Sequence, residues 1–153
     1  MSSNLSSRRG LVYLAFVLLS FLAASSVPTP LYHLYQEAWH FSPATLTMVF
    51  GVYALSLLGA LLTVGSLSDY LGRKPVILLA LLLNMLAMLM FVYASDVGWL
   101  LAARVMQGFA TGMATSVLGA ALLDNSRTQG ALVNSVSPLL GMAFGALGTS
   151  LLV

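Results

Sequence analysis

A single arginine, Arg104, lies within an apolar run and is a candidate functional residue. Arg104 is the only Asp, Glu, Lys or Arg residue between Asp96 and Asp124. A central arginine costs about 2.5–3.5 kcal/mol on membrane-insertion scales, so it usually faces a polar partner or a water-filled cavity. Gln107, one helical turn further on, favours such a polar lining. In the alternative, Arg104 snorkels to the headgroups, because Trp99 lies only about 8 Å away along a helix.

A second charged group, Asp69, Arg73 and Lys74, lies in a short segment that separates two apolar runs. Segment 65–75 also holds two glycines, which allow a tight turn, and Pro75, which suits the first turn of a helix. We expect a charged hairpin here, in which Asp69 and Arg73 share one face if the connection is helical. In the alternative, the segment is an ordinary loop whose basic residues only set the orientation of the chain.

The sequence gives little support for a metal site or for an enzyme active site. His33, Glu37 and His40 could be imagined as metal ligands, but the chain has no Cys and no third His to complete a shell. Solvated loop histidines are the better interpretation. The sequence has no Walker-type phosphate-binding motif and no acid–base pair well inside an apolar run. We therefore expect no enzyme, metal or cofactor, and no nucleic-acid partner, since Lys and Arg are few.

The composition places these residues on membrane helices. Hydrophobic residues make up 59% of the chain and charged residues 7%, with a mean hydropathy of +0.97, whereas soluble domains carry about 25% charged residues. About 20 apolar residues span a bilayer as a helix. We therefore predict an all-α, polytopic helical membrane protein that forms one membrane unit. The predicted spans are residues 11–31, 45–64, 75–94, 99–122 and 131–153.

The first apolar run has an alternative interpretation as a cleaved signal peptide, because Arg8 and Arg9 precede it and small residues follow it. The four further runs favour a membrane span. Pro28 and Pro30 are expected to end or kink its helix, and Ser42-Pro43 is expected to start the next one. Four aromatic residues beyond the prolines are expected at the membrane interface: Tyr32, Tyr35, Trp39 and Phe41.

The basic residues predict the orientation. Outside the fourth span, the basic residues fall on one side of five alternating spans: Arg8, Arg9, Arg73, Lys74 and Arg127. The connections on the other side hold only Glu37 and Asp96 among the fixed charges. Cytoplasmic loops carry an excess of Lys and Arg. We expect an integral protein of a bacterial inner membrane, with its N-terminus in the cytoplasm.

Small residues predict close helix packing in the fourth and fifth spans. Gly108, Gly112 and Ser116 follow Arg104 at every fourth position, and Gly141 and Gly145 repeat this spacing. Small residues four apart form a flat stripe on which another helix packs closely. Packing within the chain and self-association through these stripes are both possible.

Segment 65–75 resembles a signature between the second and third spans of major facilitator superfamily transporters, and it lies between the second and third predicted spans. The matching residues are Gly65, Leu67, Asp69, Gly72, Arg73 and Lys74. Tyr70 departs from the pattern, because it stands where the family usually has a basic residue. Arg104, Gln107 and Gly108 look like a second motif of this family, on its fourth span.

The resemblance implies a secondary transporter that moves a small solute by alternating access, with twelve helices in two six-helix halves. Arg104 would then take part in substrate or proton coupling. In the gating loop, Asp124 would pair with Arg73, while Asp69 would engage the opposite half. The family's antiporter motif is not complete, because the places of its proline and paired glycines after Gly145 hold other residues. These are Ala146, Thr149 and Ser150, so efflux does not follow from the motif.

Five predicted spans are one short of a six-helix half. We therefore expect an N-terminal portion of a transporter, whose partners are a small solute, the lipid bilayer and a missing C-terminal half. The chain alone is expected not to complete a transport cycle, because alternating access needs two bundles around a shared site. The alternative is a non-transporting truncated fragment or helical partner subunit, which needs only packing and topology.

Overall fold

The computed structural model describes the backbone of residues 2–152 and the side chains of residues 8–65, 68 and 70–152. Six helices and no strand occur in this part of the chain. The first two helices follow each other within one apolar stretch, so that five stretches are long and apolar enough to cross a membrane. The all-α, polytopic architecture predicted from composition is confirmed.

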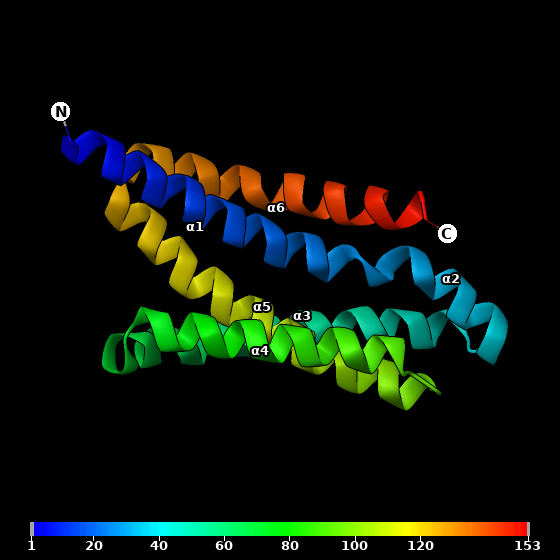
Figure 1. Ribbon diagram of the computed structural model, residues 1–153. Helices are drawn as coiled ribbons and strands as arrows, with labels where there is room; N and C mark the ends of the chain where they lie inside the picture. The colour runs from blue at the N-terminus through cyan, green and yellow to red at the C-terminus, as the bar shows by residue number, and fades with distance from the viewer. Residues whose placement is uncertain (1, 153) are drawn as a thin grey trace.

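Helices α1 (Ser2–Ser26) and α2 (Pro28–Trp39) are separated by a turn at Val27. Pro28 is the first residue of α2, where the N–H that it lacks would have had no partner in the new helix. The prediction that the prolines end or kink the first helix is confirmed. The axis changes direction at this break (Figure 1).

Helix α3 (Pro43–Leu71) begins as predicted at Ser42-Pro43, because the Ser42 hydroxyl accepts a hydrogen bond from the Thr45 N–H at 3.2 Å. It ends later than predicted. The helix continues to Leu71, and the turn into α4 (Arg73–Val92) is made by Gly72, whose φ of 83° suits a residue without a Cβ. The hairpin expected over 65–75 is therefore a one-residue turn.

This turn separates Asp69 from Arg73, because the first belongs to α3 and the second to α4. The connection is therefore not one continuous helix, and the condition under which they would share one face is not met. The side chains of Asp69 and Leu67 lie outside the described residues, so their expected roles in the gating loop stay predictions. Pro75 lies in the first turn of α4, as predicted.

Helices α5 (Val97–Asn125) and α6 (Arg127–Ser150) both start at a side-chain cap. Asp96 accepts a hydrogen bond from the Trp99 N–H at 3.0 Å, and Ser126 accepts one from the Gln129 N–H at 3.4 Å. Such caps satisfy backbone donors that have no partner within the helix. With these caps, α5 and α6 both begin before the spans that were predicted from the apolar runs.

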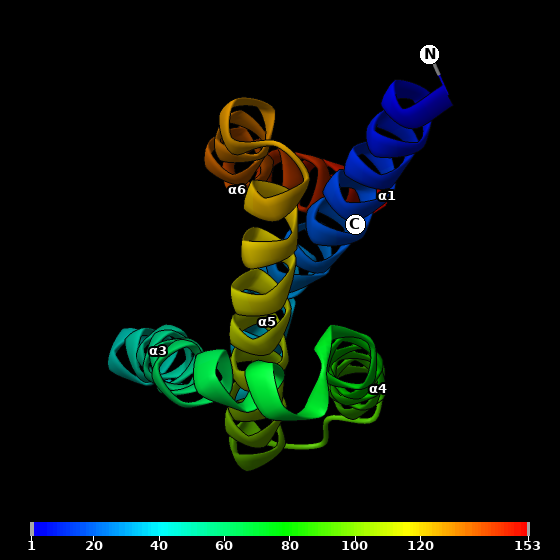
Figure 2. The same ribbon diagram turned by 90° about the vertical axis from the view of Figure 1, so that its left-hand side faces the viewer.

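Helix α5 lies at the centre, with α1, α3, α4 and α6 around it (Figure 2). Its most extensive packing is against α3 and α4, while α6 packs mainly against α1. The larger apolar core joins residues of α1, α3, α4 and α5, including Leu18, Ala60, Ala80 and Val117. Helices α1, α3 and α4 bury residues in this core, and the outer helices leave large apolar residues exposed on their other sides.

The helix ends fall into two groups (Figure 1). The start of α1, the α3–α4 turn and the α5–α6 turn lie at one end of the bundle, called here the basic end because five basic residues belong to these segments. They are Arg8, Arg9, Arg73, Lys74 and Arg127. The α2–α3 and α4–α5 connections lie at the opposite end.

Candidate functional site

Arg104 lies in the interior of the bundle, where its residue surface is only 2% exposed. The side chain thus does not extend to the surface, and the snorkelling alternative is wrong for this structure. Gln107, one turn further along α5, is fully buried beside it. The two polar side chains that the sequence singled out on the fourth span therefore belong to one buried site, named here the Arg104 site.

Three acceptors surround the guanidinium. Its Nε donates a hydrogen bond to the Tyr32 hydroxyl on α2. One terminal nitrogen, Nη1, donates to the Ser25 carbonyl of α1 at 2.9 Å and to Oε1 of Gln107 at 2.5 Å. Hydrogen bonds from a charged donor are roughly twice as strong as neutral ones. They fix the plane and position of Arg104 against the break between α1 and α2.

The break itself provides an acceptor. In a regular helix the N–H of residue 28 would donate to the carbonyl of residue 24, but Pro28 has no N–H. Nε2 of Gln107 donates to the Ala24 carbonyl instead, at 3.0 Å. The proline in α2 thus frees a backbone oxygen that a side chain of α5 uses.

Aromatic rings form the rest of the surroundings. The guanidinium carbon lies 5.0 to 5.8 Å from four ring centroids, those of Tyr32, Tyr53, Phe91 and Phe50. A cation within about 6 Å of a ring centroid is attracted by the negative face of the ring, an effect that grows when water is excluded. No carboxylate pairs with Arg104 among the residues that the structure describes. Hydrogen-bond acceptors and ring faces therefore stabilise its charge.

A different arrangement occurs at the basic end. Arg73, at the start of α4, forms an ion pair with Asp124, near the end of α5. Their side chains are 43% and 65% exposed, so water competes for both groups. Exposed ion pairs typically contribute about 0–1 kcal/mol. The pairing that the family resemblance implied is thus present, as a weak contact between two helix ends.

The small residues of α5 lie against α3. A Cβ on Gly108 would collide with the backbone oxygen of Tyr53, and one on Gly112 with that of Leu57. Further along, the Cβ position of Gly65 faces the Ser116 hydroxyl at 3.6 Å. This stripe lets α3 and α5 approach closely.

The glycines of α6 lie against α1 in the same way. A Cβ on Gly141 would meet the side chain of Leu22, and one on Gly145 would meet the Ala23 carbonyl. The two stripes are thus covered by α3 and α1 of the same chain. Of the two possibilities that the stripes offered, the structure shows packing within the chain, and self-association stays a prediction.

Helix α2 shows ordinary surface contacts, and His33, which was expected in a loop, belongs to this helix. His33 and Glu37 approach to 3.6 Å with side chains that are mostly exposed. In the described part of the chain, no three His, Cys, Asp or Glu residues gather as metal ligands would. Tyr35 donates to the Phe91 carbonyl at 3.0 Å and stacks on Trp39, so these rings hold α2 against the end of α4.

The aromatic wall of the Arg104 site escaped the sequence analysis. Tyr32 was expected at the membrane interface but is 2% exposed and bonded to Arg104. The expectation is wrong because the break at Val27 redirects α2 toward the bundle. Phe50, Tyr53 and Phe91 carry no local signal. A proline pair followed by a tyrosine, in the same chain as an intramembrane arginine, is a signal that could have found Tyr32.

Comparison with known proteins supports the same family as the motifs. Residues 14–153 match the family model of the Major Facilitator Superfamily. The chain is 39% identical over 108 residues to Multidrug resistance protein D of Escherichia coli, covering 65% of this chain and 27% of that protein. It is 31% identical over 147 residues to Efflux pump dotC of Dothistroma septosporum, covering 88% and 25%.

A third relative is Multidrug resistance protein MdtL of Salmonella paratyphi B, 36% identical over 83 residues, which cover 54% of this chain and 21% of that protein. No solved structure matches the chain significantly. The chain spans about a quarter of the length of the curated relatives that it matches. Because the family model covers all but the first 13 residues, this integral membrane protein belongs to the Major Facilitator Superfamily.

Proposed function

We propose that the chain forms the first helices of a secondary transporter and that the Arg104 site contacts the transported solute or its coupling ion. The observation that carries this proposal is a buried guanidinium with no described carboxylate partner. A charge placed inside a membrane protein at such a cost usually serves function. Its Nη2 makes no hydrogen bond within the described part of the chain, which leaves a donor for a ligand.

The direction of transport that we propose is efflux. The relatives from Escherichia coli and Dothistroma septosporum are named for multidrug resistance and efflux. The aromatic surroundings of Arg104 agree with an apolar solute, because Phe50 is 40% exposed and offers a ring face beside the charge. The solute is then an organic molecule with an aromatic or apolar body and a hydrogen-bond acceptor for Arg104.

The basic end faces the cytoplasm in this proposal, as the excess of Lys and Arg requires. The membrane would be the bacterial inner membrane. The chain has no Cys, so single cysteines test the orientation without a background. Ser68→Cys, near the α3–α4 turn, is expected to resist an impermeant thiol reagent added outside intact cells, while Ser95→Cys reacts. Reaction of Ser68→Cys from outside would reverse the orientation.

The Arg73–Asp124 pair and Asp69 would act as a cytoplasmic gate. The pair joins α4 to α5 at the basic end, where a contact of about 1 kcal/mol shifts a two-state equilibrium severalfold. In this proposal Asp69 contacts a second bundle of helices in the complete transporter. Asp69→Asn is expected to change the populations of the two states without unfolding the protein.

A chimera tests the transport function. This chain replaces the matching quarter of Multidrug resistance protein D of Escherichia coli, and efflux is measured in cells that lack the parent protein. The chimera is expected to export compounds that the parent exports, and the 153-residue chain alone is expected to show no saturable flux in liposomes. A chimera that inserts and folds but exports nothing would favour the alternative of a non-transporting helical partner. Saturable flux by the chain alone would contradict the need for further helices.

A further inference from the structure

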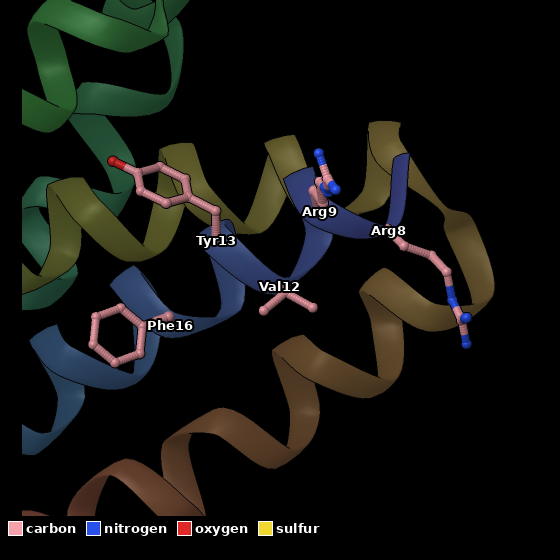
Figure 3. A pocket seen from close by; sticks show the side chains of 5 residues that line it. All are labelled: Arg8, Arg9, Val12, Tyr13 and Phe16. Atoms are coloured by element: carbon pink, nitrogen blue, oxygen red, sulfur yellow. The ribbon is translucent and has the colours of Figure 1, made fainter. Parts of the chain in front are cut away.

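The two halves of α1 differ in their surroundings. In the first half, Arg8 and Arg9 point away from each other, and Phe16 is 68% exposed (Figure 3). At the end of the helix, Ser25 and Ser26 are each only 8% exposed. The end of α1 therefore places polar groups inside the bundle.

Ser26 joins the end of α1 to α6. Its hydroxyl lies 3.0 Å from the Ala23 carbonyl oxygen of its own helix and 3.0 Å from the Met142 carbonyl oxygen of α6, so its single proton is shared between the two. Gly145 of α6 lies directly against this hydroxyl and against the Ala23 carbonyl, because a Cβ on Gly145 would collide with both. Helix α6 thus contacts the end of α1 through a hydrogen bond and through a close approach at a glycine.

The same end of α1 also serves Arg104. The last carbonyls of a helix lack a donor within that helix, and here the Ser25 carbonyl accepts a hydrogen bond from Nη1 of Arg104 at 2.9 Å. A peptide bond is planar, so the Ser25 carbonyl lies in one plane with the nitrogen and Cα of Ser26. A contact that holds Ser26 in place therefore also fixes the direction in which the Ser25 carbonyl points.

We propose that Ser26 is a positioning residue for Arg104 and that α6 acts on the Arg104 site through it. The Met142 carbonyl and the backbone of Gly145 hold the Ser26 side chain. The Ser25 carbonyl then keeps its direction toward Nη1 of Arg104, and Nη2 stays available for a ligand. The consequence for transport rests on the proposed contact of Arg104 with the solute or its coupling ion, whereas the positioning itself does not.

Hydrogen exchange at the Nε–H of Arg104 tests the positioning without transport. The purified chain, in detergent and with isotope-labelled arginine, is followed by NMR in heavy water, and Arg104→Lys identifies the signal. This Nε–H is expected to exchange slowly, because it is buried and donates to Tyr32. Ser26→Ala is expected to speed the exchange about fivefold, the factor that corresponds to one net hydrogen bond. Unchanged exchange in Ser26→Ala would overturn the proposal.

Thr149→Val is the control for the loss of a buried hydroxyl. Thr149 is 9% exposed, and its hydroxyl donates to the Gly145 carbonyl of its own helix at 2.9 Å. This variant is expected to leave the exchange at Arg104 nearly unchanged. An equal acceleration in Thr149→Val would mean that any weakening of α6 reaches Arg104, and it would overturn the specific role of Ser26.

Two glycine variants test the contact from the side of α6. Gly145→Ala is expected to push α6 away from Ser26 and to speed the exchange about tenfold, as overpacking at a close contact predicts. Gly148→Ala adds the same methyl group on the same helix, but into open space, and is expected to have no effect. Equal effects of the two glycine variants would contradict the proposal. Ser26→Ala and Thr149→Val remove only a hydroxyl, so they decide the question even if Gly145→Ala does not fold.

A double variant tests whether the two residues act through one contact. Because Ser26→Ala and Gly145→Ala break the same contact, their combined effect on the exchange should be smaller than the product of the two single effects. Effects that multiply would show two independent contacts and would contradict the proposal.

Efflux by the chimera with Multidrug resistance protein D separates this inference from the proposed function. If Arg104 binds the solute, Ser26→Ala should raise the KM for efflux about fivefold and change the maximal rate little, because a misdirected guanidinium binds less well. Faster exchange with an unchanged KM would support the positioning by Ser26 and contradict solute binding by Arg104. A raised KM with unchanged exchange would overturn the positioning.

Discussion

Arg104 and Arg73 both lie on membrane helices, but Arg104 is 2% exposed in the centre of the bundle, whereas the side chain of Arg73 is 43% exposed at the basic end. Arg104 has hydroxyl, carbonyl and amide acceptors and four aromatic rings around it. Arg73 has one carboxylate, that of Asp124. The buried charge is held by dipoles and ring faces, and the exposed charge by an opposite charge.

The difference follows from the dielectric surroundings. Around Arg104 water is excluded, so each hydrogen bond is strong and each lost acceptor is costly. Around Arg73 water competes with Asp124, and holding two side chains in one geometry costs entropy. Substitutions should therefore have large effects at the Arg104 site and small ones at the Arg73–Asp124 pair.

The largest effect is expected for Arg104→Lys in the chimera with Multidrug resistance protein D. Lysine keeps the charge but cannot contact Tyr32, Ser25 and Gln107 with a planar fork. Losing charged hydrogen bonds of about 1.5–3 kcal/mol each should lower efflux about 100-fold. Efflux and the amount of protein in the membrane are measured together. Arg73→Lys is the control, with an expected change of less than threefold; equal effects of the two substitutions would remove the contrast between the sites.

Pro28→Ala is expected to have an intermediate effect. Alanine restores an N–H that competes with Gln107 for the Ala24 carbonyl, and one net hydrogen bond of about 0.5–1.5 kcal/mol is at stake. Efflux by the chimera should fall about fivefold. Pro30→Ala restores an N–H toward the carbonyl of Ser26, which the Arg104 site does not use, and should lower efflux less. A stronger effect of Pro30→Ala would show that the freed Ala24 carbonyl is unimportant.

A double-mutant cycle of Arg73→Gln and Asp124→Asn measures the exposed pair. The coupling energy in the free energy of unfolding should be about 0.2–1 kcal/mol, as in other exposed pairs. Neither single variant should unfold the protein in detergent. A coupling energy above about 2 kcal/mol would place this pair in the class of buried, desolvated contacts.

The smallest effect is expected from salt. Raising ionic strength from about 0.15 M to 1 M shortens the Debye length from about 8 Å to 3 Å, which screens exposed charges but not buried ones. The rate at which Ser68→Cys reacts with the thiol reagent should rise less than twofold as the Arg73–Asp124 contact weakens. The rise should be absent in Asp124→Asn and unaffected by Arg104→Lys. A salt effect on labelling that disappears in Arg104→Lys would contradict the exclusion of water from the Arg104 site.

The sequence by itself determined the membrane architecture, the start of α3 and the break after α1. Ser42-Pro43 predicted the start of α3 because a cap and a first-turn proline act through local hydrogen bonds. Pro28 and Pro30 predicted the break after α1, since the missing N–H is a property of the residue itself. Arg104 was recognisable as functional because a lone charge in an apolar run is costly wherever the helix packs.

Only the tertiary structure decided which groups surround Arg104 and which helices cover the glycines. Tyr32 looked like an interfacial residue, but the direction of α2 after Val27 brought its hydroxyl to Arg104. Phe50, Tyr53 and Phe91 come from two other helices, whose rotation about their axes is set by packing on α5. Hydropathy determines whether a helix lies in the membrane. It does not determine which face of the helix contacts a neighbouring helix, because apolar side chains on all sides suit both lipid and protein.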